Sequence, residues 1–129
     1  MDLPPVPALR EQITRVRRWR LRDLLAKTVR DCSLFAVTQT AARFTAVARA
    51  QAGTLAAVIA SPDEAIRAGR ILKDGGATTV ARILVDDRML LVKRYNLKGL
   101  GHALGRALRP SRAWHSWRAA HRLQFFGIA

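Results

Sequence analysis

The chain has 129 residues and a formal net charge of +14 at pH 7, and half of its residues are hydrophobic. This length suits one small domain. The single cysteine, Cys32, cannot form an internal disulfide, which excludes a small disulfide-rich scaffold and favours a reducing compartment such as the cytoplasm. The chain does not start with a basic stretch followed by an apolar run, and its longest apolar run, residues 55–60, is too short to cross a bilayer. We therefore expect neither a signal peptide nor a membrane anchor.

Net positive charge is highest in the last third of the chain. No Asp or Glu follows Asp87, whereas nine Lys or Arg and all three His lie in residues 88–129. Such a field attracts polyanions of any chemistry, including nucleic acid, acidic lipid head groups and phosphorylated glycolipid. The alternative is that the arginines only solvate a surface.

The first 60 residues are expected to be mostly helical. In residues 8–30, apolar side chains recur at helical spacing, and the arginines between them give the helix a basic amphipathic character. Such a helix can lie on a membrane, bind a partner or simply be solvated. Residues 33–51 are rich in Ala and Thr and predict a second helix, which Gly53 ends. Ser61 and Pro62 then predict a short helix that ends near Gly69.

Residues 70–95 have the pattern of three short strands. Residues 79–85 and 89–95 are rich in aliphatic and β-branched residues, and Asp86-Asp87 between them predicts an antiparallel hairpin. Alternation places Leu91 and Lys93 on one face. Gly75 and Gly76 can take positive φ values and let a phosphate approach backbone N–H groups, although such a glycine pair is also common in hairpin turns.

Two further helices are predicted after the strands. Asn96 is placed to cap a helix that carries leucines at helical spacing and three weakening glycines. Pro110 stops that helix, Ser111 caps the last one, and Gly127 closes it.

The order of these elements resembles the amino-terminal lobe of a protein kinase: strand, glycine loop, strand, turn, strand with a lysine, helix. The words Lys93-Arg94-Tyr95-Asn96, Arg109-Pro110-Ser111-Arg112-Ala113, Ser116-Trp117-Arg118 and Ala120-His121-Arg122-Leu123 resemble more particularly the bacterial lipopolysaccharide kinase family, whose members phosphorylate Kdo or heptose. The resemblance covers residues 72–129, a little under half of the chain.

The resemblance implies an ATP site with specific residues. Lys93 would hold the α- and β-phosphates. The phosphate loop would be formed by Gly75, Gly76 and Thr78, and the adenine pocket would be lined by Leu72, Val80 and Leu91. We also predict that the basic helices present one anion-binding surface, made by Arg106, Arg109, Arg112 and Arg118.

Two departures from the family limit this reading. Ser116 stands where related kinases carry a helix glutamate that pairs with the strand lysine, so Lys93 lacks its acidic partner. The family continues beyond the last residue of this chain into a carboxy-terminal lobe, which holds the catalytic aspartate and the metal-binding residues. We therefore assign no catalytic residue, expect ATP binding to be weak or absent, and expect Mg²⁺ to require the missing lobe. The histidines are too scattered for a metal site with Cys32.

The sequence thus predicts an α+β chain: a basic helical extension over residues 1–60, which could be the remnant of a preceding module, and an incomplete kinase-like amino lobe over residues 61–129. The leading function is the ATP-binding part of a lipopolysaccharide core sugar kinase, truncated and inactive by itself. The alternative is a basic module that binds nucleic acid or an acidic membrane. Expected partners are an anionic glycolipid or membrane surface ahead of nucleic acid, and a second copy or a completing chain. We expect a cytoplasmic protein at the inner face of the inner membrane.

Overall fold

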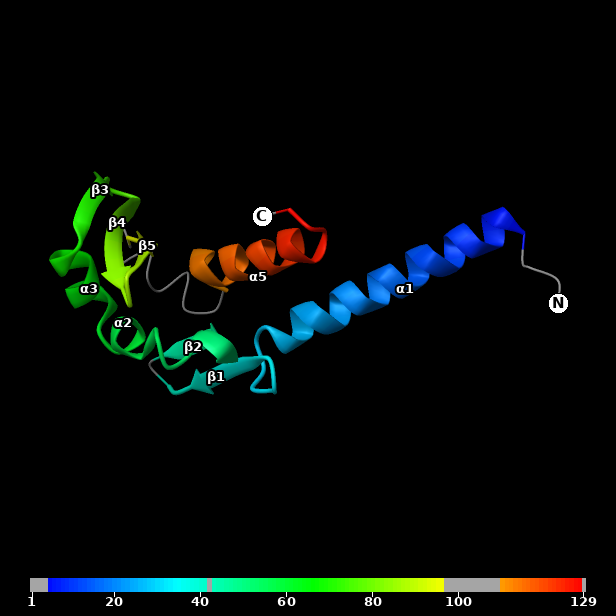
Figure 1. Cartoon of the computed structure of the whole chain (residues 1–129), viewed down its shortest axis with the longest axis horizontal. Helices are drawn as coiled ribbons and strands as arrows, with labels where there is room; N and C mark the ends of the chain where they lie inside the picture. The colour runs from blue at the N-terminus through cyan, green and yellow to red at the C-terminus, as the bar shows by residue number, and fades with distance from the viewer. Residues whose placement is uncertain (1–4, 42, 97–109, 129) are drawn as a thin grey trace. The chain divides into compact units, whose positions relative to one another are not determined.

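The computed structural model of the chain describes residues 5–41, 43–96 and 110–128. The chain is α+β, as predicted, with helices and two small sheets (Figure 1). It divides into two compact units, one made by residues 1–46 with 118–129 and the other by residues 47–117.

The first unit begins with the long helix α1, Val6–Lys27, in the place where a helix was predicted. No residue of α1 is buried. The strands β1, Phe35–Gln39, and β2, Phe44–Ala48, follow and pair as a two-stranded sheet. The chain turns between them where the N–H of Thr40 donates to the carbonyl of Arg43 at 2.7 Å.

The predicted helix over residues 33–51 is therefore wrong. Only its end is helical, as the short 3-10 helix η1, Arg49–Gln51. Phe35 and Val37 in β1, with Phe44 and Val47 in β2, are aromatic and β-branched residues that favour strands. The burial of Phe35, which is only 5% exposed, and of Val47, which is only 8% exposed, outweighs the helical preference of the alanines.

The second unit contains two short helices before its sheet: α2, Ala56–Ala60, and α3, Pro62–Ala68. As predicted, α3 begins after Ser61 with proline in its first turn and ends at Gly69. Gly69 is required there because a Cβ would lie 2.7 Å from the carbonyl oxygen of Arg82 and 2.7 Å from Cγ2 of Ile83. This close approach brings the end of α3 onto the sheet.

The sheet has the strand order β3-β4-β5, with β3 at Arg70–Asp74, β4 at Thr78–Val85 and β5 at Arg88–Tyr95. Both pairings are antiparallel, as predicted for the hairpin. Asp86 and Asp87 form its two-residue turn with φ values of 47° and 59°, the conformation that matches the twist of a tight hairpin. Positive φ is therefore found at these aspartates, whereas Gly75 does not adopt it.

One face of this sheet forms the core of the unit. Thr79, Ala81 and Ile83 alternate along β4 as its buried residues, and Ile66 of α3 is 4% exposed. The opposite face, which we call the open face, carries the alternate residues and stays largely accessible to solvent.

The last described helix is α5, Arg112–Phe125. Its start is capped as predicted, because the hydroxyl of Ser111 accepts a hydrogen bond from the N–H of Trp114 at 3.1 Å. Its end is closed at Gly127, as also predicted, with a φ of 73°. The N–H groups of Gly127 and Ile128 donate to the carbonyls of Gln124 and Leu123, the paired bonds of a Schellman motif. The helix predicted after Asn96 lies outside the described residues.

Candidate functional site

The open face brings together three of the residues predicted for an ATP site. In the β4–β5 register Val80 lies opposite Lys93, and Arg82 lies opposite Leu91. Residues directly opposite in an antiparallel pair share a face. Val80, Leu91 and Lys93 are therefore neighbours on the open face, where Leu91 is 67% exposed and Val80 is half-buried.

A second lysine lies on the same row. Lys73 of β3 pairs with Val80 from the other side, so Val80 is flanked by Lys73 and Lys93. Neighbouring strands are about 4.8 Å apart, which places the two lysine backbones about 10 Å from each other across Val80. Sequence reasoning did not single out Lys73, although its place just before the glycine pair was a signal.

Leu72 is placed less favourably than predicted. The β3–β4 register shifts between Ile71 and Lys73, so Leu72 stands at an irregularity and has no partner residue on β4. It is 51% exposed. Its side chain is available to a ligand, but its position is not fixed by the ladder as those of Val80 and Leu91 are.

The glycine turn is closed by hydrogen bonds of its own. The N–H of Gly75 donates to the carbonyl of Thr78 at 3.0 Å, so this donor is already engaged. A Cβ at Gly75 would meet only ordinary contacts, at 3.5 Å or more. Gly76 is exposed, and Thr78 is half-buried in the first position of β4. Their phosphate-binding role stays a prediction.

A polar cluster beneath this turn was not predicted from the sequence. We call it the Arg94 cluster: Asp63, Asp74, Thr79, Arg94 and Asn96. The guanidinium of Arg94 donates to Asp63 at 2.9 Å, to Asn96 at 3.0 Å and to the Thr79 hydroxyl at 3.4 Å. That hydroxyl donates in turn to Asp74 at 3.0 Å. Thr79 is only 2% exposed, so its hydroxyl is satisfied by these partners inside the unit.

Asn96 connects the Arg94 cluster to the glycine turn. Its side-chain amide donates to the carbonyl of Gly75 at 3.0 Å and to the Thr79 hydroxyl at 3.1 Å. Its backbone N–H donates to the carbonyl of Ala77, also at 3.0 Å. The described contacts of Asn96 therefore hold the turn against the end of β5. The helix that we predicted it to cap lies in residues 97–109, outside the described part of the chain.

Ser116 lies beside the end of the lysine strand. Its hydroxyl and that of Tyr95 are 2.7 Å apart, and the ammonium of Lys93 lies 4.9 Å from the centre of the Tyr95 ring. The hydrogen bond with Ser116, followed by the effect of Lys93, lowers the pKa of the Tyr95 hydroxyl. Among the described residues, no carboxylate forms an ion pair with Lys93.

The four arginines of the predicted anion-binding surface are only partly placed. Arg106 and Arg109 lie outside the described residues. Arg112 is exposed at the start of α5, and Arg118 is half-buried six residues later. At about 3.6 residues per turn, six residues separate two side chains by about 120° around a helix. The helix therefore does not bring Arg112 and Arg118 onto one face, and their shared role stays a prediction.

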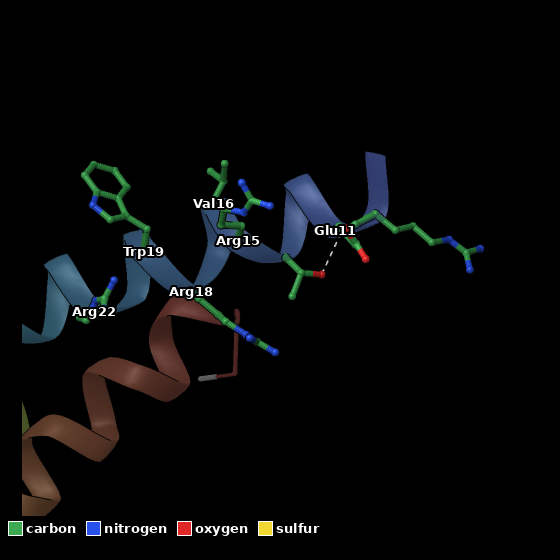
Figure 2. Close-up of a pocket in the computed structure, with 8 residues that line it drawn as sticks. Glu11, Arg15, Val16, Arg18, Trp19 and Arg22 are labelled. Carbon is green, nitrogen blue, oxygen red and sulfur yellow. Dashed lines mark hydrogen bonds between the residues drawn. The ribbon is translucent and has the colours of Figure 1, made fainter. Parts of the chain in front are cut away.

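A second candidate surface runs along α1. Figure 2 shows a hollow on this helix, lined by Arg10, Glu11, Thr14, Arg15, Val16, Arg18, Trp19 and Arg22. Trp19 is 59% exposed and projects on the same side as Val16. Every lining residue comes from one helix, so the hollow is a surface groove between side chains and offers a small ligand only one wall.

The described residues contain no group of His, Cys, Asp and Glu that could hold a metal ion. Within the same part of the chain, no helix has the length and hydropathy needed to cross a membrane. No protein-family model, curated protein or solved structure matches this chain.

Proposed function

We propose that the sheet unit binds ATP on its open face, as the amino-terminal lobe of a lipopolysaccharide core sugar kinase would. The observation that carries the proposal is the β4–β5 register, which sets Val80 beside Lys93 and leaves Leu91 next along the same exposed face. Apolar side chains next to a lysine suit a ligand that joins a flat base to a charged phosphate chain.

The helix α5 adds support for this role. In a kinase amino lobe, a helix residue stands against the strand lysine and fixes its position. Here Ser116 reaches Tyr95, whose ring contacts the Lys93 ammonium. A neutral hydroxyl acting through a tyrosine holds a lysine less firmly than a carboxylate does, because it contributes no opposite charge. We therefore expect ATP affinity to be low.

The proposal covers binding and not phosphoryl transfer. Transfer needs an aspartate to position the acceptor and acidic or amide ligands for Mg²⁺. No Asp or Glu follows Asp87 in this sequence, and the acids of the Arg94 cluster are engaged in hydrogen bonds. We expect the purified 129-residue chain to transfer no phosphate from ATP to a Kdo- or heptose-containing glycolipid. Reproducible stoichiometric transfer would contradict this.

The test of binding is protection of lysines from acylation, read by mass spectrometry. ATP should slow acylation of Lys93 and leave Lys27, which pairs with Asp23 at 2.7 Å in α1, at its original rate. Inorganic triphosphate is the matched control, since it carries the phosphate charge without the base. Equal protection by triphosphate and ATP, or no protection of Lys93 at saturating ATP, would overturn the proposal.

A pair of variants completes the test. Lys93→Met should abolish the ATP-dependent protection of Lys73, its neighbour across Val80, whereas Lys27→Met should preserve it. Both variants remove one positive charge from the chain, so an effect of net charge alone would change them equally.

A further inference from the structure

The helix α1 carries an apolar stripe that nothing in the described part of the chain buries. Its residues Val6, Leu9, Ile13 and Val16 recur at intervals of three and four, which places them on one side of the helix. Each is between 45% and 65% exposed. A helix of a globular protein normally turns such a stripe toward a core. An exposed apolar stripe is therefore a candidate surface for binding a partner.

The stripe continues into a groove within the same unit. Leu9, Ile13 and Val16 line it on one side, and Phe125 and Phe126 at the end of α5 line it on the other. The two phenylalanine rings meet edge to face, with centres 5.4 Å apart. Arg17 lies beside the stripe, Arg20 lies at its end, seven residues after Ile13, and both line the groove. The groove is thus lined mainly by apolar side chains together with two basic ones.

The positive charge of α1 indicates that its partner surface is negatively charged. The helix has seven Arg and Lys but only two acids, Glu11 and Asp23. Arg18 and Arg22 are four residues apart, a spacing at which like charges destabilise a helix. The described ion pair of α1 joins Asp23 to Lys27 at its far end. An anionic surface would relieve this repulsion and stabilise the helix that carries it.

The aliphatic stripe decides which anionic surface fits best. Nucleic acid binds arginine-rich helices through phosphates and base edges and has no need of four large exposed aliphatic side chains in a row. An amphipathic helix on a bilayer needs both parts: apolar residues that enter the acyl boundary and basic residues that meet head groups. Trp19, exposed between Arg15 and Arg22, is of the type enriched at that boundary (Figure 2).

We propose that α1, with Phe125 and Phe126, forms a docking surface for a bilayer containing anionic phospholipid. The helix lies along the membrane, Leu9, Ile13 and Val16 enter the acyl boundary, and Arg17 and Arg20 contact lipid phosphates. This surface belongs to the first unit and does not depend on nucleotide binding by the second.

The experiment uses the full 129-residue chain with Trp114→Phe and Trp117→Phe, which leaves Trp19 as the fluorescent reporter. It is titrated with vesicles of phosphatidylcholine alone or with phosphatidylglycerol, and binding is measured by sedimentation. With phosphatidylglycerol we expect binding, a blue shift of Trp19 emission and a gain of helical circular dichroism. Binding to phosphatidylcholine should be at least tenfold weaker, because the electrostatic attraction is missing.

Two variants test the two parts of the surface. Ile13→Ser with Val16→Ser should weaken binding at least tenfold by removing inserted apolar area. Arg17→Gln with Arg20→Gln should weaken it roughly 20- to 30-fold, at about one factor of five per arginine near an anionic surface. The matched control is Arg67→Gln with Arg88→Gln, which changes two exposed arginines of the other unit. This control has the same net charge as the Arg17→Gln, Arg20→Gln variant, but it should bind vesicles like the parent.

The opposite results overturn the proposal. Equal weakening by the control pair would assign binding to net charge alone. Unchanged vesicle binding after Ile13→Ser with Val16→Ser would show that the apolar stripe is not inserted, and salt-sensitive binding of a DNA duplex in the same variant would identify nucleic acid as the partner. Concentration-dependent dimers that these substitutions abolish without vesicles would show that a second copy covers the stripe.

Discussion

The three-stranded sheet and the helix α1 are both regular, but they are held in different ways. Each strand of the sheet is fixed by its neighbours, and the β4–β5 ladder runs without a break from Thr78 opposite Tyr95 to Val85 opposite Arg88. By contrast, α1 has no buried residue and no side-chain cap at its start. The contacts that hold the sheet lie within the described chain, whereas no described residue buries the apolar stripe of α1.

The two regions also treat charge differently. In the sheet unit Arg94 donates to acceptors in α3, in β4 and just after β5, so its charge is compensated where it lies. In α1 the arginines outnumber the acids and lie in solvent. A compensated charge serves the stability of its own unit, whereas an uncompensated one is available for association with an anionic partner.

The same substitution in both regions should give the sharpest contrast. Ile66→Ala removes a side chain that is 4% exposed between α3 and the sheet, and we expect a loss of about 2–4 kcal/mol in the free energy of unfolding. Ile13→Ala on α1 removes one that is 48% exposed and should change it by less than about 0.5 kcal/mol. Urea titrations measure both. Similar losses would show that α1 is covered in solution and would contradict this difference between the two regions.

Two separate glycine-to-alanine variants test how closely α3 approaches the sheet. Gly69→Ala places a methyl group 2.7 Å from the backbone oxygen of Arg82, so α3 must move, and we expect a loss of about 1–3 kcal/mol. Gly53→Ala, where nothing lies within 4 Å of the new methyl group, is the control. It should be neutral within about 0.5 kcal/mol. Equal effects in thermal melts would mean that this contact does not hold α3.

The Arg94 cluster can be probed through its buried hydroxyl. Thr79→Val keeps the shape of the side chain and leaves Asp74 and Asn96 without their shared partner, which should cost about 1–2 kcal/mol. Thr78→Val, one position earlier in the same strand, is the matched control and should cost less. If the two variants unfold at the same urea concentration, the hydrogen bonds of Thr79 contribute nothing net.

A smaller effect is expected from pH in the first unit. The ring of His121 lies edge-on to Phe35 with centres 5.0 Å apart, and burial lowers its pKa below the ordinary value of 6.5. As the pH falls, His121 therefore takes up a proton in the unfolded chain before it does so in the folded chain. The stability that depends on neutral His121 is complete above pH 6.5 and is lost as the pH falls toward the lower folded pKa. His121→Gln should remove this pH dependence of stability, which is measured by urea titrations of the parent and the variant at a series of pH values. An unchanged pH dependence in the variant would assign it to other groups.

Local patterns were enough to predict the sheet of the second unit. Two aliphatic runs separated by Asp86-Asp87 define a hairpin with a short turn, and Ser61-Pro62 and Gly69 mark the ends of a short helix by backbone chemistry alone. The shared face of Leu91 and Lys93 follows from alternation. The position of Val80 beside them needed only the register that the two-residue turn imposes.

Other features depend on contacts that local patterns do not contain. Residues 33–51 resemble a helix because alanine is their commonest residue, whereas the structure pairs β1 with β2 as strands. A repeated signal was present, since Phe35 and Val37 are followed nine to ten residues later by Phe44 and Val47. The Arg94 cluster joins residues as far apart as Asp63 and Arg94, so no short window of sequence could predict it.

That long reach also gives the Arg94 cluster a place in the order of folding. A two-residue turn lets β4 and β5 pair within microseconds, because the chain closes only a short loop. The ion pair of Arg94 with Asp63 spans 31 residues and needs α3 to lie beside the hairpin. We therefore expect the local pairing of β4 with β5 to form first and the Arg94 cluster to form last. The amide hydrogen of Asn96, bonded to Ala77 beside this cluster, should exchange with solvent sooner than those in the middle of the β4–β5 ladder.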